Sequence, residues 1–196
     1  ERGRLPIMLN YYGAHTGRFS GGDKLNLQNL PARGNNTIRR ALKAPEGQVL
    51  IACDSSQIEA RMVAWVAEQH DLIGAFAEKR DVYSEFASEV YGRTITKADK
   101  IERFVGKTCI LGLGYGMGAD KFKATLKIGM GGISVDMPAE DAKRTVDLYR
   151  AKYGRIAEIW KSCQEALKAM ARGHETEVGV GISLRCTPEG VHLPNG

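Results

Sequence analysis

The chain has 196 residues, of which 43% are hydrophobic and 26% are charged, as in soluble globular proteins with one domain or two lobes. No apolar run approaches the roughly 20 residues that a membrane-spanning helix needs, so no membrane partner is expected. Cysteine spacing matches no zinc site and indicates reduced thiols in a cytoplasmic protein, with Cys53 and Cys109 in the core. Because the chain begins with Glu1 and closes on no structural element, we expect part of a longer polypeptide.

The excess positive charge is confined to the first quarter of the chain. Residues 1–50 contain eight Lys or Arg and three Asp or Glu, whereas residues 51–196 contain twenty of each. A basic stretch that also carries Asn and Gln can follow a phosphate backbone. The alternative is a set of solvated loops, because Gly and Pro punctuate residues 1–46 and predict extended, looping chain.

A buried strand is predicted at 48–53, where a short apolar run ends at the carboxylate of Asp54. A helix follows, opened by Ser55 or Ser56, with Glu59 placed three residues after Ser56 as in a capping box. The side chains of this helix that we expect to point inward are those of Ile58, Met62, Val63, Trp65 and Val66.

Most of the chain after residue 70 is predicted to be helical. Helices are expected at 71–76, 83–91, 102–116 and 139–172, the third of them preceded by a start signal with Thr96 as its cap. Gly154 divides the last into two, and its apolar stripe contains Val146, Tyr149, Tyr153, Ile156, Trp160, Cys163, Leu167 and Met170. Residues 129–138 predict a loop, and the alternating polarity of 175–184 predicts a strand.

The most informative pattern is a set of four side chains at steps of four: Arg103, Lys107, Leu111 and Tyr115. On a helix these side chains share one face, and we call them the four-residue row. Two cations, an aliphatic group and an aromatic ring match the charged tail, sugar and base of a nucleoside triphosphate. Two alternatives remain open. One is an ordinary amphipathic helix with solvated cations, and the other is a buried strand at 108–111 that leads into the glycine-rich stretch 112–118.

Asp54 is a candidate ligand for Mg2+, because this hard cation prefers carboxylate oxygens and keeps phosphate oxygens as further ligands. Two such ions would stabilise the attacking and leaving oxygens of a phosphoryl transfer. That site needs at least one more carboxylate from elsewhere. The alternative is that Asp54 only caps a helix.

These motifs resemble those of family A (DNA polymerase I-like) DNA polymerases. Residues 53–61, Cys-Asp-Ser-Ser-Gln-Ile-Glu-Ala-Arg, resemble motif A, which reads Asp-Tyr-Ser-Gln-Ile-Glu-x-Arg. Residues 103–116 resemble motif B, with Arg, Lys and Tyr at the family spacing. Upstream, the family also has segments like 15–20, 26–31 and 38–41. The motifs occur in family order, and the resemblance covers roughly residues 10–172.

The resemblance implies a role for each matching residue. Asp54 would bind both catalytic Mg2+ ions, with help from the backbone carbonyl of Ser55. Glu59 would lie beneath the sugar of the dNTP and exclude a ribose 2′-hydroxyl. Arg103 and Lys107 would hold the triphosphate, and Lys107 would protonate the pyrophosphate leaving group. The remaining nucleotide-binding candidates are Gln57, Tyr83, Leu111 and Tyr115, and the candidates for contact with primer-template DNA are Arg18, Gln28, Asn29, Arg39 and Gly116.

The implied fold is mostly helical α+β, part of a polymerase palm sheet with a helical fingers subdomain. Residues 1–70 would form a palm segment with the DNA-contacting region, 71–172 the fingers, and 173–196 the start of a return to the palm. The implied function is template-directed transfer of deoxynucleotidyl groups from dNTP to a primer 3′-OH. The alternative is a fragment that binds nucleotide and DNA without chemistry.

Three departures from the family pattern qualify these implications. Position 111 is Leu where Phe or Tyr is usual, which resembles phage-type members and implies a phage-encoded enzyme in the host cytoplasm. Asp81-Val-Tyr83 stands where many relatives have Asp-Ile-His; a phenol can hydrogen-bond a phosphate but is not a cation near neutral pH. Motif C, a His-Asp-Glu run, is absent, since no acid follows His192, so catalysis would need the remainder of the polymerase chain.

Overall fold

The computed structural model describes residues 7–22, 27–30, 36–179 and 183–193. The chain forms two units, Glu1–Asp54 and Ser55–Gly196, which we describe separately. Within the described ranges, no helix combines the length and the apolar character that crossing a bilayer requires. All four cysteines are free thiols.

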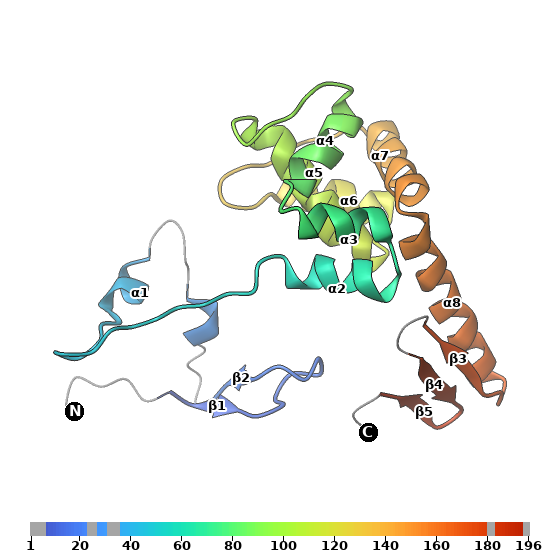
Figure 1. The fold of residues 1–196 in the computed structure, drawn as a ribbon, viewed down its shortest axis with the longest axis horizontal. Helices are drawn as coiled ribbons and strands as arrows, with labels where there is room; N and C mark the ends of the chain where they lie inside the picture. The colour runs from blue at the N-terminus through green and yellow to red at the C-terminus, as the bar shows by residue number, and fades with distance from the viewer. Residues whose placement is uncertain (1–6, 23–26, 31–35, 180–182, 194–196) are drawn as a thin grey trace. The chain divides into compact units, whose positions relative to one another are not determined.

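The N-terminal unit contains little regular structure. Strands β1 (Leu9–Asn10) and β2 (Ser20–Gly21) pair antiparallel, and the short helices η1 (Leu27–Asn29) and α1 (Thr37–Ala41) follow (Figure 1). None of the described residues of this unit is buried.

The prediction of a buried strand at 48–53 is wrong. No described strand pairs with this segment, and the side chains of Val49 and Ile51 are 82% and 84% exposed. Cys53 is exposed as well, so its predicted place in the core is also wrong. An apolar run becomes a strand only where a neighbouring strand accepts its backbone hydrogen bonds, and none does so within the described residues.

The second unit is mainly helical (Figure 1). Its helices are α2 (Ile58–Val66), α3 (His70–Ala77), α4 (Val82–Tyr91), α5 (Lys100–Gly112), η2 (Leu113–Tyr115), α6 (Ala119–Ile128), α7 (Ala139–Lys152) and α8 (Gly154–Ala171). The predicted helices at 71–76, 83–91, 102–116 and 139–172 are confirmed, as is the division of the last one at Gly154. The alternative strand at 108–111 is wrong, because these residues lie in α5.

The core of this unit surrounds α5. The side chains of Val105 and Cys109 on α5 are fully buried, and burial raises the pKa of the Cys109 thiol well above its usual value. On the neighbouring helices, the Phe86 ring lies 5.6 Å from that of Tyr149 and 5.9 Å from that of Tyr153, measured between centroids. The prediction that Cys109 is a core residue is confirmed.

Two expectations about helix caps are corrected. The N-cap of α2 is Gln57 in the left-handed region, φ +57°, with no side-chain capping bond, so the Ser56–Glu59 capping box does not form. Asp99 is the N-cap residue of α5, and Thr96 instead donates to the Asp99 carboxylate from its backbone N–H and its hydroxyl, both at 2.9 Å.

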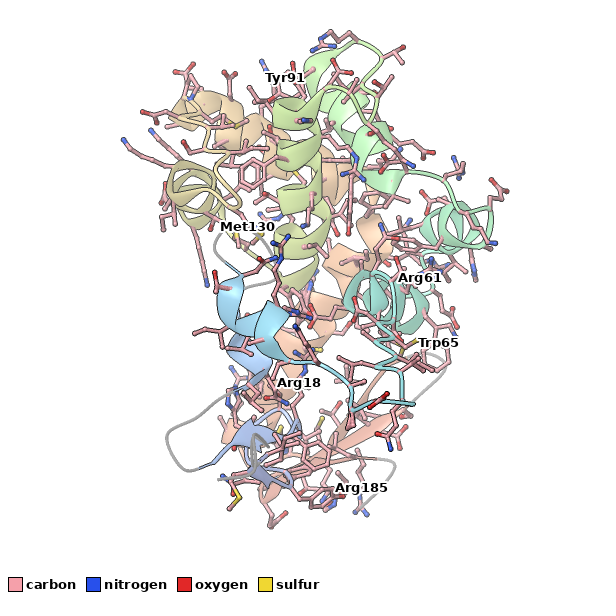
Figure 2. All side chains as sticks on the ribbon, turned by 90° about the vertical axis from the view of Figure 1, so that its left-hand side faces the viewer. Arg18, Arg61, Trp65, Tyr91, Met130 and Arg185 are labelled. Atoms are coloured by element: carbon pink, nitrogen blue, oxygen red, sulfur yellow. The ribbon has the colours of Figure 1, made fainter. Side chains whose placement is uncertain are left out.

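The apolar faces of two helices also differ from expectation. On α2 the buried residues are Ala60 and Ala64, whereas Ile58, Met62 and Trp65 are exposed; small residues let the helix lie close to its neighbours. Figure 2 shows Trp65 on this helix. Along α8, Trp160 and Leu167 are more exposed than the stripe predicts.

A small antiparallel sheet ends the chain, with strands β3 (Thr176–Val178), β4 (Leu184–Thr187) and β5 (Gly190–His192). Val178 and Cys186 pack with Ala166 of α8 in a small second core. The predicted strand at 175–184 is confirmed over β3, while positions 180–182 of that prediction lie outside the described residues.

Helices α4 and α5 approach so closely that only glycine fits at position 106. A Cβ on Gly106 would lie 2.1 Å from the backbone carbonyl oxygen of Tyr83 and 3.0 Å from the Ala87 Cβ. A heavy atom cannot occupy the first of these positions, and backbone cannot move aside as a flexible side chain can. Gly106 therefore sets the distance between the two helices.

We predict that Gly106→Ala destabilises the chain by roughly 2 kcal/mol or more, because α4 must move away from α5. Urea unfolding measures this. The control is Gly74→Ala in α3, where a new Cβ meets nothing within 4 Å and a gain of about 0.5–1 kcal/mol is expected from helix propensity. Equal effects of the two substitutions would contradict the close packing.

Candidate nucleotide-binding site

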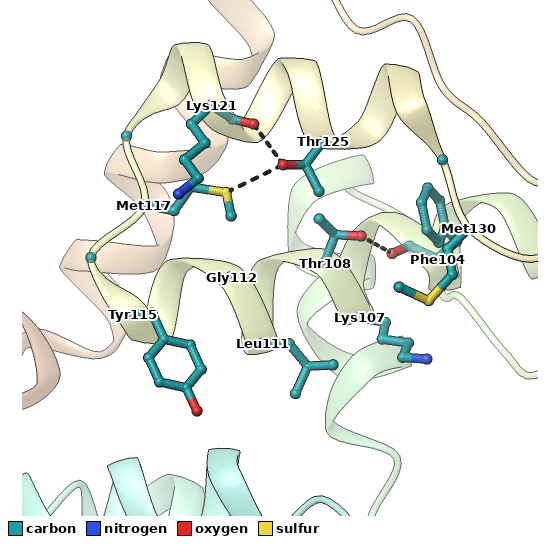
Figure 3. Close-up of a pocket in the computed structure, with 13 residues that line it drawn as sticks. Phe104, Lys107, Thr108, Leu111, Gly112, Tyr115, Met117, Lys121, Thr125 and Met130 are labelled. Carbon is teal, nitrogen blue, oxygen red and sulfur yellow. Dashed lines mark hydrogen bonds between the residues drawn. The ribbon is translucent and has the colours of Figure 1, made fainter. Parts of the chain in front are cut away.

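The four-residue row lies on α5 and η2, as predicted. Lys107, Leu111 and Tyr115 project from one side of the helix (Figure 3), and the Tyr115 side chain is 54% exposed. The opposite face of α5 carries the buried residues Val105 and Cys109. The core therefore fixes the rotation of α5, and with it the direction in which the row points.

Three members of the row, Lys107, Leu111 and Tyr115, line a pocket of about 500 Å³. The rest of the lining comes from α5, α6 and the chain on either side of α6. It consists of Phe104, Thr108, Gly112, Gly116, Met117, Gly118, Lys121, Thr125, Gly129 and Met130. The pocket thus joins two lysines to an otherwise mostly apolar wall (Figure 3). Such a wall suits a flat, partly apolar ligand with an anionic group.

Arg103, the first member of the row, does not line this pocket. Its Nε lies 2.8 Å from Oδ2 of Asp81, its Nη2 lies 3.1 Å from Oδ1, and its guanidinium carbon lies 5.3 Å from the centroid of the Tyr83 ring. Burial raises the pKa of Asp81, but hydrogen bonds from Arg103 and Ser84 and the nearby cation outweigh it and hold this pKa below its usual value. Asp81 is thus a negative charge that neutralises Arg103 at neutral pH.

Sequence reasoning missed the role of Asp81. The segment Asp81-Val-Tyr83 was compared with a family segment, and only Tyr83 was predicted to bind nucleotide. The available signal was an acid two residues before the predicted helix at 83–91. Acids are common near helix starts, and this position does not reveal that the partner of Asp81 lies 22 residues away.

The motif A residues Ser55, Gln57 and Glu59 lie at the start of α2. Arg61 holds this turn: its Nε donates to the Ser56 carbonyl at 3.0 Å, and its guanidinium carbon lies 4.8 Å from the centroid of the Phe76 ring (Arg61 is labelled in Figure 2). The arginine of motif A is therefore a structural residue here. Asp54 ends the other unit, so its approach to the row stays a prediction.

The DNA-contact candidates are distributed over both units. Arg18 follows the turn after β1, Gln28 lies in η1, and both are exposed. Arg39 on α1 is exposed and donates from Nη1 to the Leu30 carbonyl at 3.3 Å. The side chain of Asn29 lies outside the described residues. Gly116 follows η2 in the left-handed region, φ +71°.

The glycine-rich stretch 112–118 is the end of α5, the turn η2 and the link to α6. Trp160 of α8 holds it, since its indole Nε1 donates to the Gly114 carbonyl at 2.8 Å. A Cβ on Gly114 would lie 3.4 Å from the Tyr149 hydroxyl and 3.8 Å from a methyl of Val63. The hydrogen bond from α8 therefore holds the residue that precedes Tyr115, and side chains of α2 and α7 leave little space around it.

We predict that Trp160→Phe lowers the free energy of unfolding by about 1 kcal/mol, because an aromatic ring is kept at this position while the hydrogen bond from the indole N–H to Gly114 is lost. Chemical unfolding followed by circular dichroism measures the change. Trp65→Phe is the matched control, since Trp65 is 49% exposed on α2 and should change stability little. A loss for Trp65→Phe as large as that for Trp160→Phe would argue against the role of the indole N–H.

No group of three or more His, Cys, Asp or Glu side chains that could hold a metal occurs among the described residues. Asp54 offers one exposed carboxylate, and the donor type fits Mg2+. A complete site on this carboxylate needs ligands from a substrate, water or further chain.

Comparisons with known proteins identify the family of the chain. A family model, DNA polymerase family A, matches residues 1–180. The thermostable DNA polymerase I of Thermus aquaticus is 36% identical over 166 residues, which are 83% of this chain and 19% of that protein. DNA polymerase I of Chloroflexus aurantiacus is 40% identical over 119 residues, 60% of this chain and 12% of that protein. The POL domain of Pol1 from M. smegmatis, solved in complex with DNA primer-template and dNTP, matches with a TM-score of 0.68 and 27% identity over 94% of this chain and 30% of that one.

The fold is mostly helical α+β, which confirms the predicted fold class, and three residues of the four-residue row line a pocket. The chain belongs to DNA polymerase family A. It spans only 19% of the length of the Thermus aquaticus polymerase and 12% of the length of the Chloroflexus aurantiacus polymerase. These relatives are bacterial, so the expectation of a phage origin finds no support.

Proposed function

We propose that this chain forms the nucleotide-binding part of a DNA-directed DNA polymerase, which transfers deoxynucleotidyl groups from dNTP to a primer 3′-OH. The observation that carries the proposal is the row on α5, whose Lys107, Leu111 and Tyr115 line one pocket in a member of family A. The structurally similar M. smegmatis domain was solved with DNA primer-template and dNTP, which supports the same ligands for this chain.

In this proposal the primer 3′-oxygen forms a bond to the α-phosphorus, the bond from that phosphorus to the bridging oxygen breaks, and pyrophosphate leaves. Arg103 and Lys107 neutralise the charge that accumulates on the triphosphate, and Lys107 donates a proton to the pyrophosphate. Leu111 packs on the base, Glu59 lies beneath the sugar, and Tyr115 contacts Glu59 and guards the position of the templating base. Ser55, Gln57 and Tyr83 complete the nucleotide site.

Mg2+ would be held by Asp54 and the carbonyl of Ser55, and when bound it supplies charge stabilisation for both reacting oxygens. A second carboxylate must come from the remainder of the polymerase chain, because the 196 residues contain no His-Asp-Glu run. Primer-template DNA would contact Arg18, Gln28, Asn29, Arg39 and Gly116.

The proposal also assigns segments of the chain to the subdomains of a polymerase. Residues 1–70 would contribute a palm segment, 71–172 the fingers, and 173–196 the return to the palm. Such an enzyme would act in the cytoplasm.

We predict that Arg103→Ala and Lys107→Ala, made in the full-length polymerase, each raise the KM for dNTP roughly 10- to 100-fold, the cost of losing a charged hydrogen bond. Steady-state primer extension measures this. Lys143→Ala is the control, because this lysine on α7 pairs with Asp147 and its side chain is 73% exposed. If Arg103→Ala and Lys107→Ala both leave KM unchanged, the assignment of the row to the triphosphate is wrong.

We further predict that the 196-residue chain alone does not extend a primer, since its metal site lacks a partner carboxylate. A gel assay with labelled primer-template, dNTP and Mg2+ tests this, and the full-length enzyme is the positive control. Robust incorporation by the isolated chain would refute the prediction. Binding of DNA without extension would instead agree with the alternative of a non-catalytic binding fragment.

A further inference from the structure

The side chain of Arg103 is held by three contacts from the start of α4. Asp81, the residue before α4, accepts two hydrogen bonds from Arg103 through its two carboxylate oxygens. The hydroxyl of Ser84 donates to the same carboxylate at 2.9 Å. The ring of Tyr83 lies beneath the guanidinium. Both partners of the ion pair are partly shielded from water, with 31% of the Arg103 side chain and 20% of the Asp81 side chain exposed.

The geometry of this pair leaves a defined part of the guanidinium available. An arginine has five N–H groups, and Asp81 uses one on Nε and one on Nη2. The three others, two on Nη1 and one on Nη2, have no hydrogen-bond acceptor within the described residues. Two of them, one on Nη1 and one on Nη2, form the outer edge of the guanidinium, which matches two oxygens of a phosphate.

We propose that Asp81 is a positioning residue, which fixes the guanidinium of Arg103 so that its Nη1–Nη2 edge faces the triphosphate of the incoming nucleotide. This inference rests on the proposed function, because it requires Arg103 to bind the triphosphate. Asp81 does not touch the nucleotide; it acts only through Arg103.

The physical reason is that a free arginine side chain has many rotamers, and ordering them on binding reduces affinity. The ion pair and the Tyr83 ring order the side chain before the nucleotide arrives. The packing at Gly106 holds the backbone of Tyr83 against α5, so the three contacts belong to one rigid junction. The Asp81 carboxylate also lowers the positive potential around Arg103. Its contribution to nucleotide binding is therefore to align the guanidinium, because it weakens the electrostatic attraction between Arg103 and the triphosphate.

The test is a double-mutant cycle in the full-length polymerase, read as KM for dNTP and kcat in primer extension. Asp81→Ala alone should raise KM roughly tenfold, the cost of losing alignment of one charged contact. In the Arg103→Ala background the same substitution should change KM less than twofold. Asp81→Asn, which keeps the size and one acceptor, should lie between wild type and Asp81→Ala.

Glu89→Ala is the matched control, because Glu89 also lies on α4 and forms an inter-helix ion pair, with Lys152 of α7, but does not contact the row. Its KM should equal that of wild type. Thermal unfolding of every variant separates loss of fold from loss of alignment. Ser84→Ala removes the other partner of the carboxylate and should lower stability without a tenfold change in KM.

Each outcome has a separate meaning. An equal rise in KM for Asp81→Ala with and without Arg103 would overturn the inference, since Asp81 would then not act through Arg103. A normal KM for Asp81→Ala beside a raised KM for Arg103→Ala would also overturn it while leaving the proposed function intact. A normal KM for Arg103→Ala would overturn both the triphosphate role of Arg103 and the inference.

Discussion

The absence of a side chain at Gly106 lets α4 lie so close to α5 that the carbonyl oxygen of Tyr83 is 2.1 Å from the position that a Cβ would take. This contact determines which residues of α4 lie beside the first turn of α5. It holds the beginning of α4, with Asp81 and Tyr83, next to Arg103. The same packing buries Val105 and Cys109, which sets the rotation of α5 and points the remaining cation and the tyrosine at the pocket. One close backbone approach therefore orients the whole row.

The row is consequently divided into two environments. Arg103 lies in an ion pair with Asp81, whereas Lys107, Leu111 and Tyr115 border a pocket between α5 and α6. A bidentate carboxylate limits the directions in which an arginine can bind, while Lys107, as a flexible point charge, has no ion-pair partner among the described side chains. In the proposed function, the fixed Arg103 would therefore orient the triphosphate, while Lys107 would be able to follow the leaving group. Trp160 adds a third constraint by holding the turn before Tyr115.

Helical periodicity was enough to predict α3, α4, α5 and the helical stretch of α7 and α8, because their apolar spacing reflects burial against one another. The division between α7 and α8 was predicted from Gly154. The sequence of residues 48–53 could not reveal that no strand forms there, since a strand depends on partners that local sequence does not contain. On α2 the pattern did not show that Ala60 and Ala64, rather than the larger residues, face the core. For the site, spacing alone predicted that the row shares a face. The Asp81–Arg103 pair depends on two helices meeting, and a residue spacing of 22 has no periodic signature.

The uncovered apolar run at Val49, Leu50 and Ile51 has a practical consequence for handling this polypeptide. Branched aliphatic residues without proline or charge are the usual nuclei of intermolecular β-sheet, and here nothing in the described chain shields their backbone. The tendency of this polypeptide to aggregate in dilute buffer would therefore depend on these few residues rather than on the well-packed helices. Fusion to a solubilising partner, or co-expression with the complementary part of the enzyme, is the appropriate way to keep such a preparation monodisperse.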